Sequence, residues 1–427
     1  MNRIISNALR ETCERVGCLL YNTLDSCARF SYSLHKEKLF RDEGLSVLYV
    51  APSILVPGFH GGSTHVLELS RNLTRLGCNV VVLARRLPGQ SQFEVVDGVN
   101  VFRIWRGLFK PVSTDSPHVA INPTWASKLP EKIYFNTIYV AYASLVALYL
   151  AKKYEVDVIL ERGDSYGAGA IVSSISKIPL VTEIRDVHQP KISLVVAKKL
   201  LVYDPSILRD KRFLYKTATM HGGVDVDRFK PMSRRDAKAL LGLSDKFVIG
   251  YSGSSMRSHR LDALIILAVR LRRMYGDRVR FLVVGPLDHT LVRSITSLRL
   301  EHYFSLAGPV PHDELPRYIN AMDVGLALYD PHKLAGPPYK VYEYMACGVP
   351  AITTETIYSK RIIEDGLNGF LIKMNDREEL LHKISLLIEN PDLLHEMGIK
   401  AREVALKFSW REEARRILEV LKEVCAH

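Results

Sequence analysis

The chain has 427 residues, too many for one ordinary hydrophobic core, so two domains of roughly 150 to 200 residues are expected. With 47% hydrophobic and 24% charged residues, the composition is that of a globular protein, with no low-complexity tract. A formal net charge of +12 predicts attraction to anions. Because no basic block or nucleic-acid motif is present, phosphorylated small molecules or an anionic membrane surface are favoured over DNA.

The first 44 residues have no signal-peptide layout and predict an amphipathic helical extension before the fold. Six scattered cysteines without metal-binding spacing predict reduced thiols in a cytoplasmic protein. Residues 133–154 form a long apolar stretch that polar side chains interrupt and a core strand follows. A buried or half-exposed helix is therefore favoured there over a spanning helix or one that dips into a bilayer surface. Peripheral contact with the inner face of the membrane is left open.

From residue 45, short β-branched runs alternate with helical periodicity, which predicts a parallel, doubly wound α/β sheet. The rhythm restarts near residue 246, so a second sheet of the same kind is predicted. The domains expected are 45–230 and 231–407, with a hinge within 224–236 and a terminal helix over 408–427. Strands are predicted at 45–52, 79–85, 99–105, 156–160, 179–184, 246–253, 279–286, 302–310, 324–330 and 350–355, and helices at 64–77 and 261–276.

Ligands of such folds lie beyond the carboxyl ends of strands, so the crevice between two facing sheets is the natural site. The stretch GFHGGSTHVLEL, residues 58–69, joins the first strand to its helix, and the amides of Gly61 and Gly62 can approach an anion there. A tight connection without a ligand is the alternative. Neither a G-x-G-x-x-G nor a G-x-x-x-x-G-K-[ST] pattern is present, which argues against NAD-type and ATP-type sites.

Polar side chains follow the predicted strand at 179–184. Glu183, Arg185, Asp186 and His188 stand where a parallel sheet presents functional groups, so they could bind sugar hydroxyls or act as acid–base groups. Helix capping and mutual pairing of these residues is the alternative.

Two further polar clusters are found in the second half and in the hinge. Arg257, His259 and Arg260 follow the strand at 246–253 and would form a positive rim for a diphosphate, or only a solvated basic turn. Asp225 and Asp227 have the D-x-D spacing of some divalent-metal sites, but their position in the hinge favours a turn.

The stretch AGPPYKVYEYMACG predicts a glycine/proline loop and then a helix from about Tyr339 to Ala346, closed by Gly348. Lys340 lies in the first turn, where the helix dipole disfavours a cation, so an anion such as a phosphate is expected beside it. Glu343 shares that face of the helix and can accept hydrogen bonds from two vicinal hydroxyls, as a ribose presents. A simple surface Lys–Glu pair is the alternative.

These pieces, in this order, resemble the GT-B glycosyltransferases, and specifically the retaining glycosyltransferase family 4, from about residue 45 to the C-terminus. The fold implied is α/β, with two Rossmann-like domains facing across a cleft. The stretches that carry the resemblance are GGSTHVLELSRNLTRLGCNVVVLAR, HGGVDVDRFKP, AGPVPHDELPRYINAMDVGLAL, KVYEYMACGVPAITTETIYSKRIIEDGLNGFLI and FSWREEARRILEVLKEV.

The resemblance implies transfer of a hexose-type sugar from a nucleotide-diphosphate-sugar to a hydroxyl acceptor on a glycan, polysaccharide or glycolipid, with retention of the anomeric configuration. UDP- or GDP-linked donors are expected rather than ADP-linked ones, with no metal, no other cofactor and no nucleic-acid partner. Glu343 would hold the donor ribose, and basic side chains would neutralise the diphosphate. The residues implied are Arg185, Asp186 and Lys340 for catalysis, and Gly61, Gly62, Glu183, Arg257, His259, Lys340 and Glu343 for substrate binding.

Three positions depart from the family pattern. Ala335 stands where the first glutamate of a Glu-x7-Glu pair is usual, Ser254 stands at a usual arginine position, and Gly222 replaces the hinge asparagine. Two other functions are therefore weighed. One is a nucleotide-sugar-binding subunit without catalysis, and the other is a sugar-nucleotide 2-epimerase, whose motifs match much less well.

Overall fold

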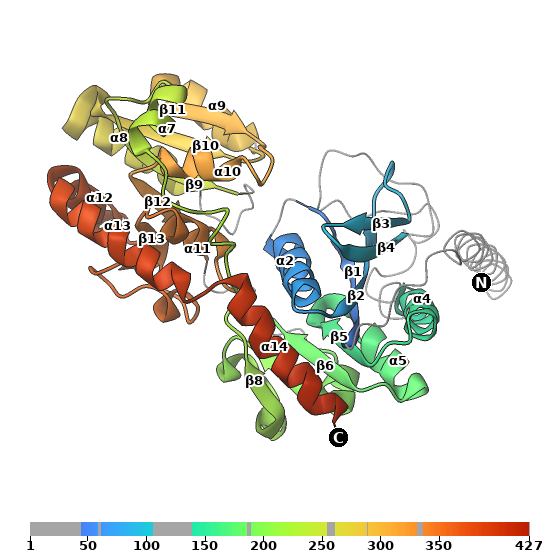
Figure 1. Ribbon diagram of the computed structural model, residues 1–427. Coiled ribbons are helices and arrows are strands. Elements are labelled where there is room, and N and C mark those ends of the chain that lie inside the picture. The colour runs from blue at the N-terminus through green and yellow to red at the C-terminus, as the bar shows by residue number, and fades with distance from the viewer. Residues whose placement is uncertain are drawn as a thin grey trace, which may run out of the picture.

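The computed structural model describes residues 44–58, 61–105, 139–185, 189–253, 261–287, 289–330 and 336–426. These residues form two α/β domains joined by a hinge (Figure 1). The predicted helical extension over residues 1–44 lies outside the described residues, apart from Gly44.

The N-terminal domain is built on a sheet whose central strands are almost wholly buried. Over the described residues this sheet has eight strands in the order β3-β4-β2-β1-β5-β6-β7-β8, all parallel except β3 at one edge. Continuous apolar runs suit these strands, because helices cover both faces of a doubly wound sheet. The strands are β1 (Ser46–Leu55), β2 (Asn79–Arg86), β3 (Phe93–Val96), β4 (Val99–Trp105), β5 (Val158–Arg162), β6 (Leu180–Ile184), β7 (Lys199–Val202) and β8 (Thr217–Thr219), and the helices are α2 (Gly61–Arg75), α4 (Val140–Lys153), α5 (Ala168–Ser176) and α6 (Lys191–Val196).

The C-terminal domain repeats this architecture. In its described part, six parallel strands follow the order β11-β10-β9-β12-β13-β14. Strands β10 and β11 are added on one side of β9, and β12, β13 and β14 are added on the other side. The carboxyl end of β9 is therefore a switch point of the kind where open α/β sheets bind ligands. The strands are β9 (Phe247–Ser252), β10 (Val279–Val284), β11 (Phe304–Gly308), β12 (Val324–Ala327), β13 (Ala351–Thr354) and β14 (Gly369–Ile372), and the helices are α7 (Arg234–Leu240), α8 (Asp262–Tyr275), α9 (His289–Ser297), α10 (Leu315–Asn320), α11 (Tyr339–Ala346), α12 (Arg377–Glu389), α13 (Pro391–Leu406) and α14 (Trp410–Cys425).

Each strand that the sequence predicts coincides with a strand of the structure, and the predicted α/β fold class is confirmed. The sequence does not predict β3, β7, β8 and β14. Each of these has four residues or fewer, as do β12 and β13, which the sequence does predict.

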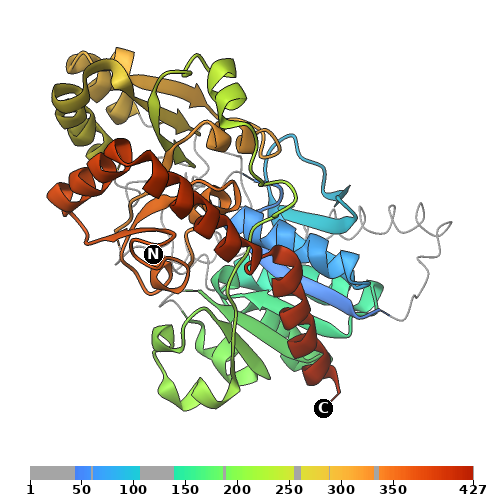
Figure 2. The ribbon, with the colours of Figure 1, turned by 60° about the vertical axis from the view of Figure 1, so that its left-hand side comes forward.

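Helix α14 runs from the C-terminal domain onto the N-terminal domain and lies against α2 (Figures 1 and 2). Its buried side chains recur three or four positions apart, so one stripe of the helix faces the protein. Glu413, in this stripe, accepts the backbone N–H groups of His221 at 2.6 Å and Gly222 at 3.3 Å. The terminal helix therefore holds the hinge as well as the N-terminal domain.

The described part of the apolar stretch 133–154 forms α4, a helix of 14 residues with buried and exposed positions along it. The prediction of a buried or half-exposed helix is confirmed for these residues. Within the described ranges, no helix is both long enough and apolar enough to cross a membrane.

Candidate functional site

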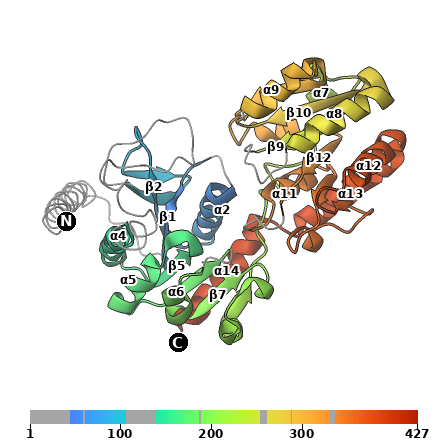
Figure 3. The same cartoon turned by 180° about the vertical axis from the view of Figure 1, so that it is seen from behind.

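Helix α11 lies on the side of the C-terminal domain that faces α2 (Figures 1 and 3). It begins at Tyr339, after Gly336, Pro337 and Pro338, and its bounds agree with those predicted from the sequence. A proline inside a helix lacks the backbone N–H donor and clashes with the preceding turn, so α11 cannot extend toward the N-terminus through Pro337 and Pro338. At the other end Gly348 adopts a φ of 70°, which a glycine accepts without strain.

Lys340 is buried in the C-terminal domain at the carboxyl end of β9. Its Nζ lies 3.9 Å from the centre of the Tyr251 ring and 5.5 Å from that of Tyr329. A Cβ built on Gly253, the residue after β9, would lie 3.1 Å from this Nζ. The Nζ has no hydrogen-bond partner among the described residues. Burial lowers the pKa of Lys340 to about 7, although nearby Glu343 acts in the other direction.

Glu343 is the half-buried residue of α11, on the same helix face as Lys340. No ion pair within 4.0 Å joins these two side chains in the described structure, so the alternative of a surface Lys–Glu pair is wrong. Glu343 Oε1 instead lies 3.0 Å from Nε2 of His312, in the loop between β11 and α10.

Glu183, at the end of β6, is wholly buried in the N-terminal domain. Its Oε1 accepts the hydroxyl of Tyr49 at 2.6 Å and lies 2.9 Å from Nε2 of His65. Burial alone would raise the pKa of Glu183, but His65, Arg185 and Arg162 lower it to about 2. These contacts direct Glu183 at protein groups, and its predicted role in binding substrate is not tested by them.

His65 connects this carboxylate to the C-terminal domain. Burial lowers the pKa of His65, so at neutral pH the ring is uncharged and carries one N–H group. The carboxylate can only accept, so Nε2–H donates to Glu183 and Nδ1 accepts the Tyr339 hydroxyl at 2.9 Å. Tyr339 in turn accepts from the Tyr203 hydroxyl at 2.8 Å, and Tyr203 accepts from Arg185 Nη1 at 3.0 Å.

The network therefore has one consistent direction, from Arg185 through two tyrosines and His65 to Glu183. Arg185 also lies close to the C-terminal domain, because a Cβ on Gly336 would be 3.0 Å from its Nη2. The predicted catalytic residue Arg185 is thus placed between the end of β6 and the loop before α11.

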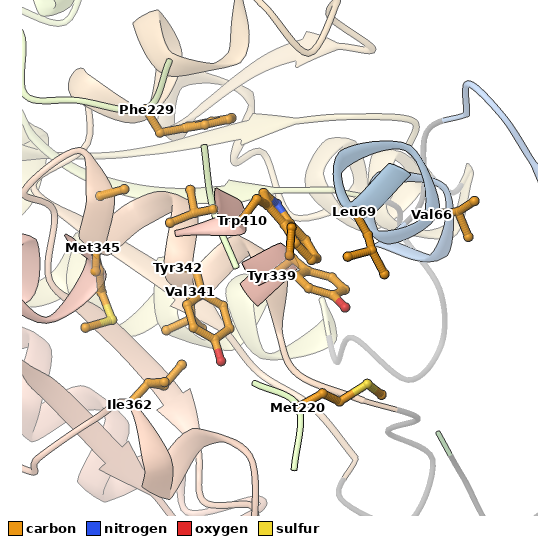
Figure 4. Close-up of a cluster of buried hydrophobic side chains, with 14 of the residues drawn as sticks. Val66, Leu69, Met220, Phe229, Tyr339, Val341, Tyr342, Met345, Ile362 and Trp410 are labelled. Carbon is orange, nitrogen blue, oxygen red and sulfur yellow. The ribbon is translucent and has the colours of Figure 1, made fainter. Parts of the chain in front are cut away.

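Tyr339 fills a gap that two glycines leave open. A Cβ on Gly61, the first residue of α2, would lie 2.9 Å from its ring, and a Cβ on Gly222 would lie 3.1 Å from it. Trp410 packs against the same ring, with centroids 5.6 Å apart, and Figure 4 shows both rings beside α2. The hinge position Gly222 therefore has no room for a side chain and adopts a φ of 77°.

Asp225 makes a turn in the hinge. Its Oδ1 accepts the backbone N–H of Asp227 at 3.2 Å and that of Arg228 at 3.1 Å. The interpretation of the D-x-D spacing as a turn is confirmed for Asp225.

Several predicted site residues are not part of the described structure, and their roles stay predictions. They are Asp186, His188, Ser254, Arg257, His259, Arg260 and Ala335.

The sequence does not single out His65, Tyr203, Tyr339 or His312. Their contacts join positions far apart in the chain, so no local spacing signals them. The one available signal is polarity inside apolar runs: His65 lies in the stretch THVLEL, where it is wholly buried.

The C-terminal domain matches a known family model. Residues 233–404 match the model described as glycosyl transferases group 1. Among curated proteins, D-inositol 3-phosphate glycosyltransferase 1 of Catenulispora acidiphila is 28% identical over 215 residues, which are 48% of this chain and 51% of that protein. The putative glycosyltransferase EpsD of Bacillus subtilis is 29% identical over 211 residues, 48% of this chain and 53% of that protein. The chain spans about half the length of these curated relatives.

Solved structures resemble the chain over both domains. Sucrose-phosphate synthase from Thermosynechococcus elongatus superposes with a TM-score of 0.71 at 16% identity, covering 90% of this chain and 99% of that one. HepE from Anabaena, solved in complex with UDP and glucose, superposes with a TM-score of 0.67 at 18% identity, covering 89% of this chain and 100% of that one. At such identities the likeness establishes the fold.

Proposed function

We propose that the protein is a retaining glycosyltransferase, because residues 233–404 match the family model of the group 1 glycosyl transferases and the chain has the GT-B fold. It transfers a hexose-type sugar from a nucleoside-diphosphate sugar to a hydroxyl of a glycan, polysaccharide or glycolipid. One observation carries the proposal. The ammonium of Lys340 is buried at the carboxyl end of β9 without a hydrogen-bond partner among the described residues, one helical turn from Glu343.

In this reaction the bond between the anomeric carbon and the diphosphate oxygen breaks, and a bond to the acceptor oxygen forms on the same face. The acceptor proton passes to the leaving diphosphate. Negative charge grows on that diphosphate in the transition state, and a fixed, buried cation stabilises it more than mobile water would. Lys340 supplies this cation, with Arg257 and His259 as further cations and the amides of Gly61 and Gly62 at the start of α2 as donors.

The nucleoside is held by Glu343. Its carboxylate accepts hydrogen bonds from the two vicinal hydroxyls of a ribose, which explains an acid at the one half-buried position of an otherwise buried helix. HepE, a protein of the same fold, has been solved with UDP-glucose. A UDP- or GDP-linked donor is the form we propose here, and side-chain cations remove the need for a metal.

The residues after β6 act on the sugar side. Arg185 lies beside the loop that precedes α11, and the hydrogen-bonded network with Tyr203 fixes its guanidinium. We assign Arg185 and Asp186 to the transferred sugar or its phosphate. Glu183 acts through His65, which it orients, and so serves as a positioning residue for the N-terminal side of the site.

A membrane-bound acceptor is consistent with one surface of the N-terminal domain. Val195 on α6 is 66% exposed and Tyr215 is 80% exposed, near the exposed Lys191 and the exposed Arg212, which is paired with Asp210 at 2.7 Å. Lys216 binds the carbonyl oxygen of Val195 at 3.3 Å, which keeps the two segments together. Apolar and cationic groups side by side suit an anionic bilayer surface.

Vesicle sedimentation tests that contact. The protein should sediment with vesicles that contain phosphatidylglycerol and remain free with phosphatidylcholine alone. Replacing Val195 and Tyr215 by serine should release it, and unchanged sedimentation of this variant would remove the assignment.

The reaction itself is tested with purified protein and UDP-glucose, GDP-mannose or ADP-glucose, in the presence and absence of EDTA. At least one donor should release its nucleoside diphosphate, EDTA should not abolish release, and Lys340→Met should reduce it by at least about 100-fold. With an acceptor present, the glycosylated product is isolated, and the coupling constant of its anomeric proton in the NMR spectrum shows whether the configuration is retained or inverted. Binding of a donor without turnover with any acceptor would favour the non-catalytic subunit instead.

A further inference from the structure

His312 lies between the carboxylate of α11 and an arginine of the hinge. Its Nε2 is 3.0 Å from Oε1 of Glu343, and its Nδ1 is 2.9 Å from Nη1 of Arg228. The imidazole also lies against the ring of Phe229, with ring centroids 5.1 Å apart and the ring planes tilted by 56°. Two segments that are far apart in the sequence, the hinge and α11, thus hold one ring in place.

The hydrogen-bond partners of this ring determine where its proton lies. An arginine can only donate, so Nδ1 of His312 must accept from Arg228. Because Nδ1 accepts, the ring carries its hydrogen on Nε2, which donates to Glu343 Oε1. Burial disfavours a charged ring, although the Glu343 carboxylate raises the pKa of His312 overall. Arg228 therefore selects the tautomer in which His312 binds the carboxylate, as outer partners select the tautomer of metal-binding histidines.

This contact occupies one oxygen of Glu343. Oε2 forms no further hydrogen bond to a described residue, and the Glu343 side chain is 12% exposed. A carboxylate tethered through one oxygen has fewer rotamers to lose when the other oxygen meets a ligand. The geometry fits a preorganised acceptor for a diol.

Arg228 continues the chain of contacts into the N-terminal domain. Its Nη1 also lies 3.2 Å from Oε1 of Glu68 on α2, and its Nη2 lies 3.4 Å from Asp225. Glu68 is in turn bound by Arg71 at 2.9 Å. The hinge arginine thus contacts polar groups of both domains, Glu68 in the N-terminal domain and His312 and Asp313 in the C-terminal domain, where Asp313 Oδ1 lies 3.3 Å from its Nε.

We propose that His312 is a positioning residue for nucleoside binding, which fixes the Glu343 carboxylate toward the ribose hydroxyls under the control of the hinge residue Arg228. The proposal rests on the proposed function, since it needs a nucleoside diphosphate at Glu343. It adds His312, which affects nucleoside binding through the side chain of Glu343. It also gives the hinge, through Arg228, an effect on the affinity for the donor.

Two isosteric substitutions separate the two contacts of the ring. The amide nitrogen of glutamine reaches the place of Nε2, so His312→Gln keeps a donor for Glu343 and loses the acceptor for Arg228. Asparagine reaches only the place of Nδ1, so His312→Asn keeps the Arg228 contact and loses the contact to Glu343. His395, an exposed residue on α13, supplies the control His395→Asn.

Calorimetric titration of the full chain with UDP, GDP and ADP identifies the nucleotide that binds best, and the variants are titrated with it. His312→Asn should bind about 10-fold more weakly than wild type, His312→Gln within about threefold, and the control unchanged. Glu343→Ala combined with His312→Asn should bind no more weakly than Glu343→Ala alone, because His312 acts through Glu343. A merely structural role would instead weaken binding in both backgrounds.

The outcomes distinguish the two claims. If wild type binds none of the three nucleotides, the proposed function fails and this inference fails with it. If wild type binds and Glu343→Ala weakens binding, but His312→Asn binds like wild type or the two losses add, the inference alone is overturned. Circular dichroism and thermal unfolding of each variant exclude loss of the fold, and if His312→Asn does not fold, equal affinities of wild type and His312→Leu would overturn it.

Discussion

The hydroxyl of Tyr339 lies 2.9 Å from Nδ1 of His65, and this hydrogen bond joins α11 of the C-terminal domain to α2 of the N-terminal domain. The same hydroxyl accepts from Tyr203 at 2.8 Å. Because all three groups are buried, the relative position of the two domains depends on a polar contact with little tolerance for change.

Tyr339→Phe should therefore destabilise the protein by about 1–3 kcal/mol, since it leaves Nδ1 of His65 without its donor in a buried place. The free energy of unfolding is measured by urea denaturation. Tyr215→Phe, at a tyrosine that is 80% exposed, is the control and should change stability by less than about 0.5 kcal/mol. Equal stability of Tyr339→Phe and wild type would mean that the network does not join the domains.

Lys340 has a cost in stability that function explains. A buried amine without a hydrogen-bond partner is unfavourable, so Lys340→Met should increase the free energy of unfolding by about 1–3 kcal/mol while donor turnover is lost. Lys238 is the matched control, because its Nζ lies 2.6 Å from the buried Asp323. Lys238→Met should destabilise by about 1–3 kcal/mol, since it removes the nearest cation from that buried carboxylate, which keeps the Val248 backbone N–H at 2.7 Å and Arg234 at 3.6 Å. Loss of stability in Lys340→Met would contradict the interpretation of Lys340 as a site held open for an anion.

The lowered pKa of Lys340 also predicts a pH dependence. The unfolded chain holds this proton with an ordinary lysine pKa, whereas in the folded protein the pKa is about 7. Between these values the unfolded state binds more protons, so the free energy of unfolding rises with pH, by up to about 1.4 kcal/mol per pH unit. Wild type should therefore gain stability relative to Lys340→Met from about pH 7 upward. Parallel curves for the two proteins would show that this lysine keeps an ordinary pKa.

Glu183 predicts a pH dependence of stability on the acidic side of neutrality. Its pKa falls from 4.5 to about 2 on folding, so the carboxylate contributes stability above its unfolded pKa and loses it as the pH falls toward about 2. The difference between wild type and Glu183→Gln should shrink from pH 6 to pH 3 in urea denaturation. Burial raises the pKa of Glu68. The free energy of unfolding of wild type relative to Glu68→Gln should therefore rise, not fall, as the pH is lowered from 6 to 3.

The sequence predicts much of this architecture and one part of the site. The strands are found because buried parallel strands are apolar runs with a length of their own, and α11 is found because prolines and glycines mark both of its ends. Lys340 and Glu343 stand out because charges at helical spacing are unexpected between such signals.

The contacts that complete the site could not be predicted in the same way. His65 meets Tyr339 across 274 positions of the chain, and His312 meets Arg228 across 84. Only the packing of two domains brings these pairs together. The burial of Lys340 away from Glu343 also depends on packing, since helical spacing alone equally permits a surface ion pair.

The central claim is that Lys340 binds the diphosphate and Glu343 binds the ribose of the nucleoside. One comparison of affinities separates these roles. The best-binding nucleoside diphosphate among UDP, GDP and ADP is titrated calorimetrically against its own monophosphate, for wild type, Lys340→Met and Glu343→Gln. Lys340→Met should lose at least about 10-fold in affinity for the diphosphate and much less for the monophosphate, whereas Glu343→Gln should weaken both alike. If Lys340→Met binds the diphosphate as tightly as wild type does, the account is wrong.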